Sequence, residues 1–213
     1  MSRSPISRVM TFMRPHPEPM DRAAELELVE RLRRADADAF DEVHGAFHAR
    51  LFSFLARLSR RRDVAEDLLE ETWLRVVASA PRLRTDTQLA PWLFTIARNL
   101  YVSYCRTRML DSAAVASMSL WPVLPYAPSP FEATAANELA RRVEAALATL
   151  PAIYREALLL VGGEGLTPVE AAAICNVRPE AMRQRLSRAR TLLAAALEQA
   201  AEGGAVALGE VLP

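Results

Sequence analysis

The chain has 213 residues; 51% of them are hydrophobic, and 26 basic residues balance 26 acidic ones. This length allows one large domain or two small ones, and the hydrophobic share can fill a core, which excludes an intrinsically disordered chain. A net charge of zero argues against a general nucleic-acid coat protein. Seven glycines among many alanines, leucines, arginines and glutamates favour helices over strands.

Neither a membrane span nor a secretion signal is predicted. No apolar run approaches the roughly 20 residues that a bilayer requires. The first 20 residues scatter arginine and proline and hold no continuous apolar segment, unlike a signal peptide. Cys105 and Cys175 are single cysteines far apart in sequence, with no CxxC pair and no disulfide framework. These features predict a reduced, cytoplasmic protein.

Prolines and polar runs divide the chain into five parts. Residues 1–20 are rich in proline and are expected to form a flexible tail. Helical patterns fill 21–110 and 134–201, while 111–133 holds four prolines and cannot be a regular helix. Residues 202–213 are expected to be a frayed tail. The predicted fold class is all-α, with two small helical domains that an extended linker joins and that move independently.

The segment 62–77 (RDVAEDLLEETWLRVV) predicts an amphipathic helix. Asp63 and Glu66 have the spacing of a capping box. At about 100° per residue, one side of this helix is apolar and the other is an acidic stripe. The apolar side holds Leu68, Leu69, Thr72, Trp73 and Val76, and the stripe holds Asp67, Glu70, Glu71 and Leu74. A charge run of this kind, taken alone, is most often a solvated face.

The next predicted helix covers 90–108 (APWLFTIARNLYVSYCRTR). Its helical period buries Leu93, Ile96, Ala97, Leu100 and Tyr104. The same period turns outward Thr95, Arg98, Asn99 and Arg106. A polar loop over 80–90 with two arginines precedes this helix.

The most specific local pattern is 166–190 (LTPVEAAAICNVRPEAMRQRLSRAR), which predicts a helix-turn-helix. Thr167 and Glu170 make a capping box around a first-turn proline. Asn176 lies where the turn needs a left-handed residue, and Pro179 begins the second helix. This combination is typical of DNA-binding proteins.

The second helix of this motif has a core stripe of Met182, Leu186, Ala189 and Leu193. The opposite side is polar and rich in arginine and glutamine, the residue types that bind guanine and adenine edges in the major groove. That side holds Glu180, Arg183, Gln184, Ser187 and Arg188, flanked by Arg185 and Arg190. The alternative is an ordinary amphipathic helix with a solubilising arginine face.

Several segments together resemble one family. The segments 36–58 (DADAFDEVHGAFHARLFSFLARL), 63–77 and 91–100 (PWLFTIARNL) are similar to region 2, the promoter-melting domain, of extracytoplasmic-function (ECF) sigma factors. The segments 150–175 (LPAIYREALLLVGGEGLTPVEAAAIC) and 185–193 (RLSRARTLL) are similar to their region 4, which reads the −35 element. The resemblance covers about 21–108 and 136–196.

The resemblance implies an alternative sigma factor that brings RNA polymerase core enzyme to particular promoters. Catalysis would belong to the polymerase, and no cofactor or metal is expected. The implied partners are promoter DNA, the clamp coiled coil of the largest polymerase subunit, the flap of the second subunit, and an anti-sigma factor. The implied docking residues are Asp67, Glu70, Glu71 and Leu74. The implied −10 contacts are Arg82, Arg84, Asp86, Gln88, Thr95, Arg98, Asn99 and Arg106. The implied −35 contacts are Arg183, Gln184, Ser187, Arg188, Arg185 and Arg190.

The segments 155–165 (REALLLVGGEG) and 170–175 (EAAAIC) resemble more narrowly the general-stress branch of this family in alphaproteobacteria. There, a small anti-sigma protein holds activity down until a sigma-mimicking response regulator removes it. The chain departs from the family pattern at Glu180-Ala181, where Gly-Thr is frequent, and at Asn176, where glycine is usual. A carboxylate at position 180 would repel DNA phosphate.

Three other functions fit parts of the sequence. A sigma-like decoy would bind an anti-sigma factor without touching DNA, although no room remains for a receiver domain. A helix-turn-helix regulator without polymerase docking would give the acidic stripe no purpose. An enzyme is the weakest alternative: His44 and His48 are four residues apart on a predicted helix, but no third metal ligand joins them at a typical spacing.

Overall fold

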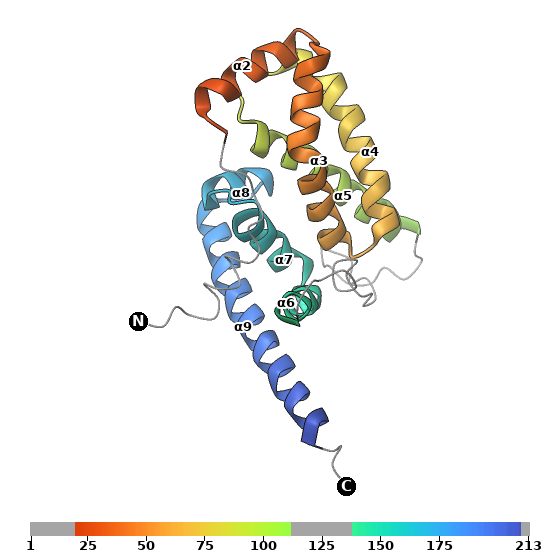
Figure 1. Cartoon of the computed structure of the whole chain (residues 1–213), viewed down its shortest axis with the longest axis vertical. Coiled ribbons are helices and arrows are strands. Elements are labelled where there is room, and N and C mark those ends of the chain that lie inside the picture. Colours follow the sequence, from red (N-terminus) through yellow and green to blue (C-terminus); the bar gives the residue numbers. More distant parts are fainter. Residues whose placement is uncertain (1–19, 112–137, 210–213) are drawn as a thin grey trace.

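The computed structural model describes residues 20–111 and 138–209, and all regular secondary structure in these ranges is helical. This confirms the all-α fold class. The predicted linker, 111–133, and the predicted N-terminal tail lie almost entirely outside the described residues. Two groups of helices make up the described chain (Figure 1). The first group is α2 (Arg22–Arg33), α3 (Ala37–Ser59), α4 (Arg62–Ser79), η1 (Ala80–Arg82) and α5 (Leu89–Asp111). The second is α6 (Glu138–Thr149), α7 (Ala152–Leu158), η2 (Leu159–Gly163), α8 (Pro168–Ile174) and α9 (Pro179–Gly209).

The first domain, α2–α5, is built around α3. Side-chain carboxylates of Asp21 and Asp36 accept hydrogen bonds from the first backbone N–H groups of α2 and α3 and so begin those helices. In the core, the rings of Phe54 and Phe94 meet edge to face with centroids 5.2 Å apart. The apolar side predicted for α4 is buried as expected, from Leu68 to Val76.

Two local predictions for this domain need correction. Helix α4 begins at Arg62, and its N-cap residue, Arg61, makes no side-chain cap; the predicted capping box at Asp63 is wrong. Asp63 instead lies in the first turn and forms an ion pair with Arg61, so its carboxylate is engaged outside the cap. On α5, Phe94 and Tyr101 are fully buried although they lay outside the predicted core face.

The second domain, α6–α9, contains the helix-turn-helix as predicted. Thr167 and Glu170 form both hydrogen bonds of the capping box at the start of α8. Asn176 has φ of 52°, the left-handed conformation that the turn requires. The core stripe of α9 is buried from Met182 to Leu193. Helix α9 continues to Gly209, past the predicted end of the helical block at residue 201.

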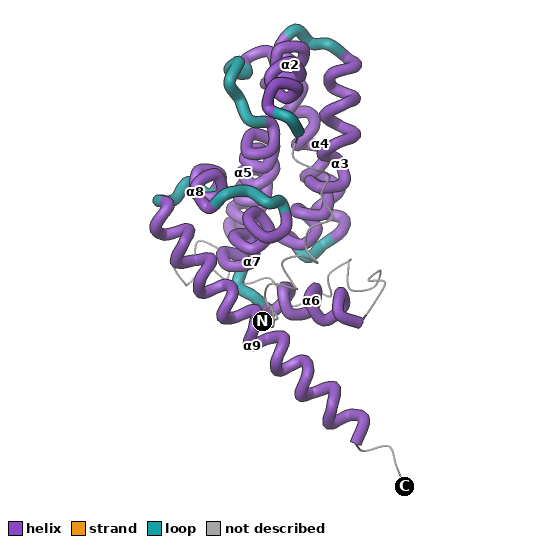
Figure 2. Tube along the Cα trace, turned by 60° about the vertical axis from the view of Figure 1, so that its left-hand side comes forward, coloured by secondary structure: helices purple, strands orange, loops and turns teal. Residues whose placement is uncertain are grey.

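The two domains pack against each other, which contradicts the prediction that they are independent. Helix α8 lies beside α5, and α7 lies beside α3, in both tube and ribbon views (Figure 2). A single cluster of buried apolar side chains includes Phe94 and Cys105 of the first domain and Ala171 and Ile174 of the second. The sequence pattern of each helix could not reveal this, because it reports only that a face is apolar and not what covers it.

The left-handed turn at Asn176 gives a stability test. A left-handed backbone conformation destabilises a residue that carries Cβ by about 1–2 kcal/mol. The penalty is smaller for asparagine and absent for glycine. We therefore expect Asn176→Ala to lower the free energy of unfolding by about 1 kcal/mol, and Asn176→Gly to change it by less than about 0.5 kcal/mol. Urea denaturation measures both. Asn99→Ala, at an exposed position inside α5, is the control and should have little effect.

Candidate polymerase- and DNA-binding surfaces

The acidic stripe of α4 faces solvent. Asp67 and Glu70 are exposed, and Leu74 is 67% exposed, an unusual position for a leucine. Val77, one turn further on, is 56% exposed and extends this apolar spot. Glu71 is half-buried and accepts a 2.8 Å hydrogen bond from Arg75 on its own helix. Asp67, Glu70 and Leu74 therefore offer an outside partner acidic groups around a hydrophobic centre.

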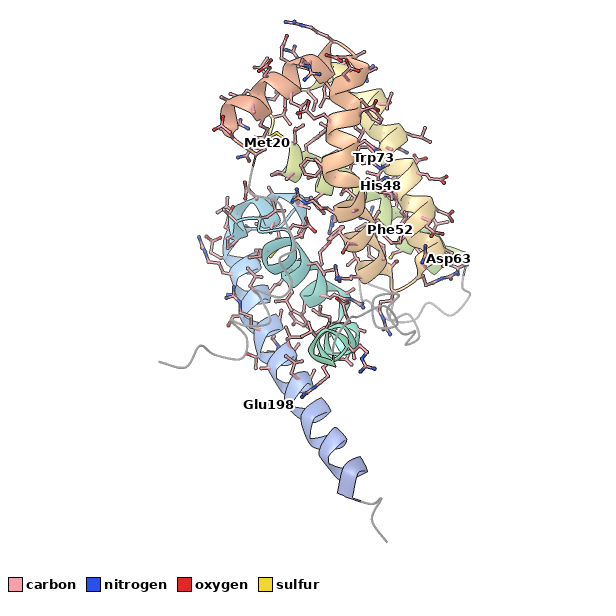
Figure 3. All side chains as sticks on the ribbon, viewed as in Figure 1. Met20, His48, Phe52, Asp63, Trp73 and Glu198 are labelled. Atoms are coloured by element: carbon pink, nitrogen blue, oxygen red, sulfur yellow. The ribbon has the colours of Figure 1, made fainter. Side chains whose placement is uncertain are left out.

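The histidine pair lies on the neighbouring surface between α3 and α4, where Figure 3 shows His48 beside Trp73. Nδ1 of His48 is 2.9 Å from Nε2 of His44, and both rings lie against the Trp73 indole. Burial, and then the neighbouring His44, lower the pKa of His48. Within 20–111 and 138–209, no group of three histidine, cysteine or acidic side chains could hold a metal ion. The pair is explained by packing on the tryptophan.

The polar side of α9 is open to solvent. Arg183, Gln184, Ser187, Arg188 and Arg190 are all exposed, and Arg185 is half-buried. The opposite side of the same turns is fully buried, which fixes the direction in which these side chains point. Glu180 accepts a weak 3.4 Å hydrogen bond from Arg183. The structure thus brings together all the side chains predicted to contact the −35 element.

The loop predicted to contact the −10 element is tied to α2. Arg82, Arg84, Asp86 and Gln88 are exposed, and Arg84 pairs with Asp86 at 3.0 Å. Arg22 donates a 2.8 Å hydrogen bond to the carbonyl of Asp86. Glu25 accepts a 2.8 Å hydrogen bond from the backbone N–H of Leu89 and so caps α5. These contacts hold the loop in place while its side chains remain accessible.

Arg98 does not point outward as predicted. Its side chain is 13% exposed, and its Nε donates a 3.0 Å hydrogen bond to Glu156 of α7, whose side chain is fully buried. Asn99 and Arg106 are exposed as expected, whereas Thr95 is half-buried and donates to the carbonyl of Pro91 at 2.6 Å. The second domain covers the side of α5 that carries Arg98, which helical periodicity alone cannot show.

Part of α5 lines a polar cleft with the helix-turn-helix. The cleft has a volume of about 500 Å³ and lies between α5 and α8. Its walls include Arg98, Asn99 and Arg106 from α5, and Ile174 and Asn176 from the second domain. In this conformation, the helix expected to bind the −10 element therefore faces its own second domain.

Two further ion pairs cross between the domains, and nothing in the sequence predicted them. Arg50 of α3 meets Glu164 at 3.0 Å, and Arg57 of α3 meets Glu144 of α6 at 2.8 Å. Both carboxylates are 6% exposed. Burial raises the pKa of the Glu164 carboxyl to about 7, although Arg50 and Arg57 oppose this shift.

A buried arginine near this interface is poorly satisfied. Arg155 of α7 is 6% exposed, and its Nε and Nη1 atoms have no hydrogen-bond partner among the described residues. Burial lowers the pKa of its guanidinium to about 10, so it remains charged at neutral pH. A buried cation with unpaired N–H groups is costly, and this cost opposes the packing of the two domains.

Glu164 predicts a dependence of stability on pH. Its pKa is about 7 in the folded chain and 4.5 in its ordinary state, so the folded chain binds more protons between these values. The contribution of Glu164 to the free energy of unfolding should therefore fall as pH rises from about 4.5 to about 7 and then stay level. Urea denaturation across this range should show a shallower decline for Glu164→Gln than for the wild type. Equal slopes would contradict the argument from burial.

Comparison with known proteins finds matches in both domains. The models "Sigma-70 region 2" and "Sigma-70, region 4" match residues 44–110 and 140–193. The ECF RNA polymerase sigma factor EcfG of Rhodopseudomonas palustris is 39% identical over 69% of this chain and 78% of its own length. RNA polymerase sigma factor CarQ of Myxococcus xanthus is 34% identical over 75% of this chain and 90% of its own length.

A solved structure shows the same fold. The sigma factor RpoE from Bartonella quintana, in complex with the anti-sigma factor NepR, aligns with a TM-score of 0.60 and 31% identity. The alignment covers 75% of this chain and 96% of RpoE. No helix in the described parts of the chain has the length and hydropathy to cross a membrane. The chain belongs to the ECF family of RNA polymerase sigma factors.

Proposed function

We propose that this sigma factor binds polymerase and promoter DNA through three separate surfaces. The acidic stripe of α4 docks on the clamp coiled coil of the polymerase, the loop 82–88 with α5 holds the −10 element, and α9 reads the −35 element. The observation that carries the proposal is the exposed polar side of α9, whose arginines and glutamine are backed by a buried core stripe. Such a side can enter a major groove without disturbing the fold.

An anti-sigma factor is the regulatory partner that best fits the comparisons. The similar protein RpoE is bound to the anti-sigma factor NepR, and the similar protein EcfG is an ECF sigma factor. These relatives support the resemblance to the general-stress branch. We propose that this chain is held inactive by a small protein of the same kind.

The decoy remains the second candidate, and the exposed side of α9 argues against it. A decoy that only binds an anti-sigma factor has no need for arginines that project into solvent from a helix-turn-helix. Run-off transcription with purified core polymerase on a panel of promoters decides between the two. Promoter-dependent transcripts support the sigma factor, and their complete absence favours the decoy.

Polymerase docking can be tested by charge reversal on α4. Asp67→Arg combined with Glu70→Arg should weaken binding to core enzyme by about tenfold or more, because the new arginines would be repelled by a partner surface that is complementary to acidic groups. Reversal of Glu27 and Asp41, exposed acidic residues on α2 and α3, makes the same change in net charge elsewhere. Fluorescence anisotropy with labelled protein measures both. If the two double variants bound core enzyme equally well, the docking assignment would be wrong.

Promoter reading can be tested by two arginines of α9 with different expected roles. Arg188→Ala should remove a base contact of about 1–3 kcal/mol and relax the preference at one or two positions of the −35 element. Arg190→Ala should weaken all promoters alike and lower the slope of binding against salt by about one counterion. Both are measured in holoenzyme. Unchanged promoter-dependent transcription in both variants would mean that the arginine side only keeps the protein soluble.

A further inference from the structure

The segment 84–88, which precedes α5, has no regular secondary structure, yet its backbone is held at both ends and in the middle. Leu83 and Leu89, which flank it, are buried in the apolar core. Between them, the backbone N–H of Thr87 donates a 3.1 Å hydrogen bond to the carbonyl of Arg84 and closes a turn. The carbonyls of Asp86 and Thr87 accept hydrogen bonds from α2.

Arg22, in the first turn of α2, is the donor to both carbonyls. Its Nη2 donates a 2.8 Å hydrogen bond to the carbonyl of Asp86, and its Nη1 donates a longer one, of 3.4 Å, to that of Thr87. The position of Arg22 is itself fixed, because the Asp21 side chain caps the first N–H groups of α2. A guanidinium presents its donors in a rigid planar fork, so it can bind two successive carbonyls at once.

Glu25, one turn further along α2, connects Arg22 to α5. Its Oε2 pairs with Arg22, and its Oε1 accepts a 2.8 Å hydrogen bond from the backbone N–H of Leu89. Leu89 is the first residue of α5, so this N–H has no partner within that helix. Both oxygens of Glu25 are therefore engaged, one by the side chain that binds the turn and one by the helix that follows it. We name Arg22 and Glu25 the α2 brace.

The α2 brace acts on the proposed −10 surface through the backbone. While Arg22 binds its carbonyl, Asp86 keeps its side chain 65% exposed and pairs with Arg84, which is 83% exposed. That pair is bidentate, since Nε and Nη2 of Arg84 donate to the two oxygens of Asp86 at 3.0 and 3.1 Å. Gln88 is exposed on the same segment. Because the backbone conformation sets the direction of each side chain, the brace determines how these groups are presented to a partner.

A preformed loop has an advantage in binding. A segment held only by its two buried ends samples several backbone conformations, and fixing one of them on binding costs conformational entropy. A segment that is ordered before it meets its partner avoids that cost. Recognition of individual bases also requires well-placed donors and acceptors, because each correct contact depends on geometry. Loss of the brace should therefore reduce discrimination between bases and not only total affinity.

We infer that Arg22 and Glu25 are positioning residues for promoter recognition, which hold the segment 84–88 in the conformation that presents Arg84, Asp86 and Gln88 to the −10 element. This inference rests on the proposed function, since the −10 element is assigned to this loop there. The brace itself lies behind the loop and does not contact DNA.

Promoter preference gives the first test, because it separates positioning from general stability. Run-off transcription by holoenzyme is compared on a promoter that the wild type uses and on two derivatives, one with a substituted −10 element and one with a substituted −35 element. Arg22→Ala should lower the preference for the intact −10 element about tenfold, the size of one lost base contact, and leave the −35 preference at its wild-type value. Arg22→Lys keeps a donor for the Asp86 carbonyl and should restore most of the preference.

Two further variants make the comparison sharper. Arg34→Ala removes the same side chain from the other end of α2, where it pairs only with Glu30 of its own helix, and should keep both preferences. Glu25→Gln retains an oxygen for the N–H of Leu89 but loses the charge that pairs with Arg22, so its −10 preference should lie between those of the wild type and Arg22→Ala. An unchanged −10 preference in Arg22→Ala, or an equal loss of both preferences, would overturn the inference.

Amide hydrogen exchange of the free full chain, followed by NMR, tests the positioning without DNA. In Arg22→Ala, the amides of Thr87 and Leu89 should exchange about tenfold faster or more, because the brace orders this segment, while those of α3 and α4 keep their wild-type rates. Unchanged exchange at both amides would overturn the positioning role. Glu25→Gln, which is nearly isosteric, carries the same test should Arg22→Ala unfold. If the holoenzyme used no promoter, the proposed function would fail, whereas the exchange rates would still show whether the brace orders the loop.

Discussion

Helix α5 is the element on which the whole arrangement depends, because both domains pack on it. Phe94 fits edge to face against Phe54 of α3, inside the first domain. On another side, Arg98 reaches Glu156 of α7, and α8 of the helix-turn-helix lies alongside. One helix therefore carries core packing, a proposed DNA-binding surface and the contact that covers it.

Features that depend on neighbouring residues could be predicted from the sequence. The capping box of Thr167 and Glu170 and the left-handed Asn176 follow from interactions within a few residues, and both are present. The exposed sides of α4 and α9 follow from helical periodicity, and they too are as predicted except at Glu71 and Arg185, which are half-buried. The missed start of α4 shows the limit of such signals, since Asp63 had the right spacing for a cap but pairs with Arg61 instead.

The contacts between domains could not be predicted in this way. Arg98 and Glu156 are 58 residues apart, Arg57 and Glu144 are 87 apart, and Arg50 and Glu164 are 114 apart. An arginine on a helix surface has the same local pattern whether water, DNA or a carboxylate from another domain covers it. Only the packing of α7 and α8 onto the first domain decides among these, and that packing is a property of the whole chain.

The interface between the domains combines an apolar cluster with three buried ion pairs. An interface of apolar side chains alone becomes more stable as more apolar area is buried, but it selects its alignment only loosely. Buried ion pairs contribute little net stability, because the loss of hydration nearly offsets the attraction, yet each pair penalises any alignment that separates it. Three such pairs around an apolar centre therefore favour one alignment of the domains while adding little to its stability. The two unpaired nitrogens of buried Arg155 add a cost that opposes this packing.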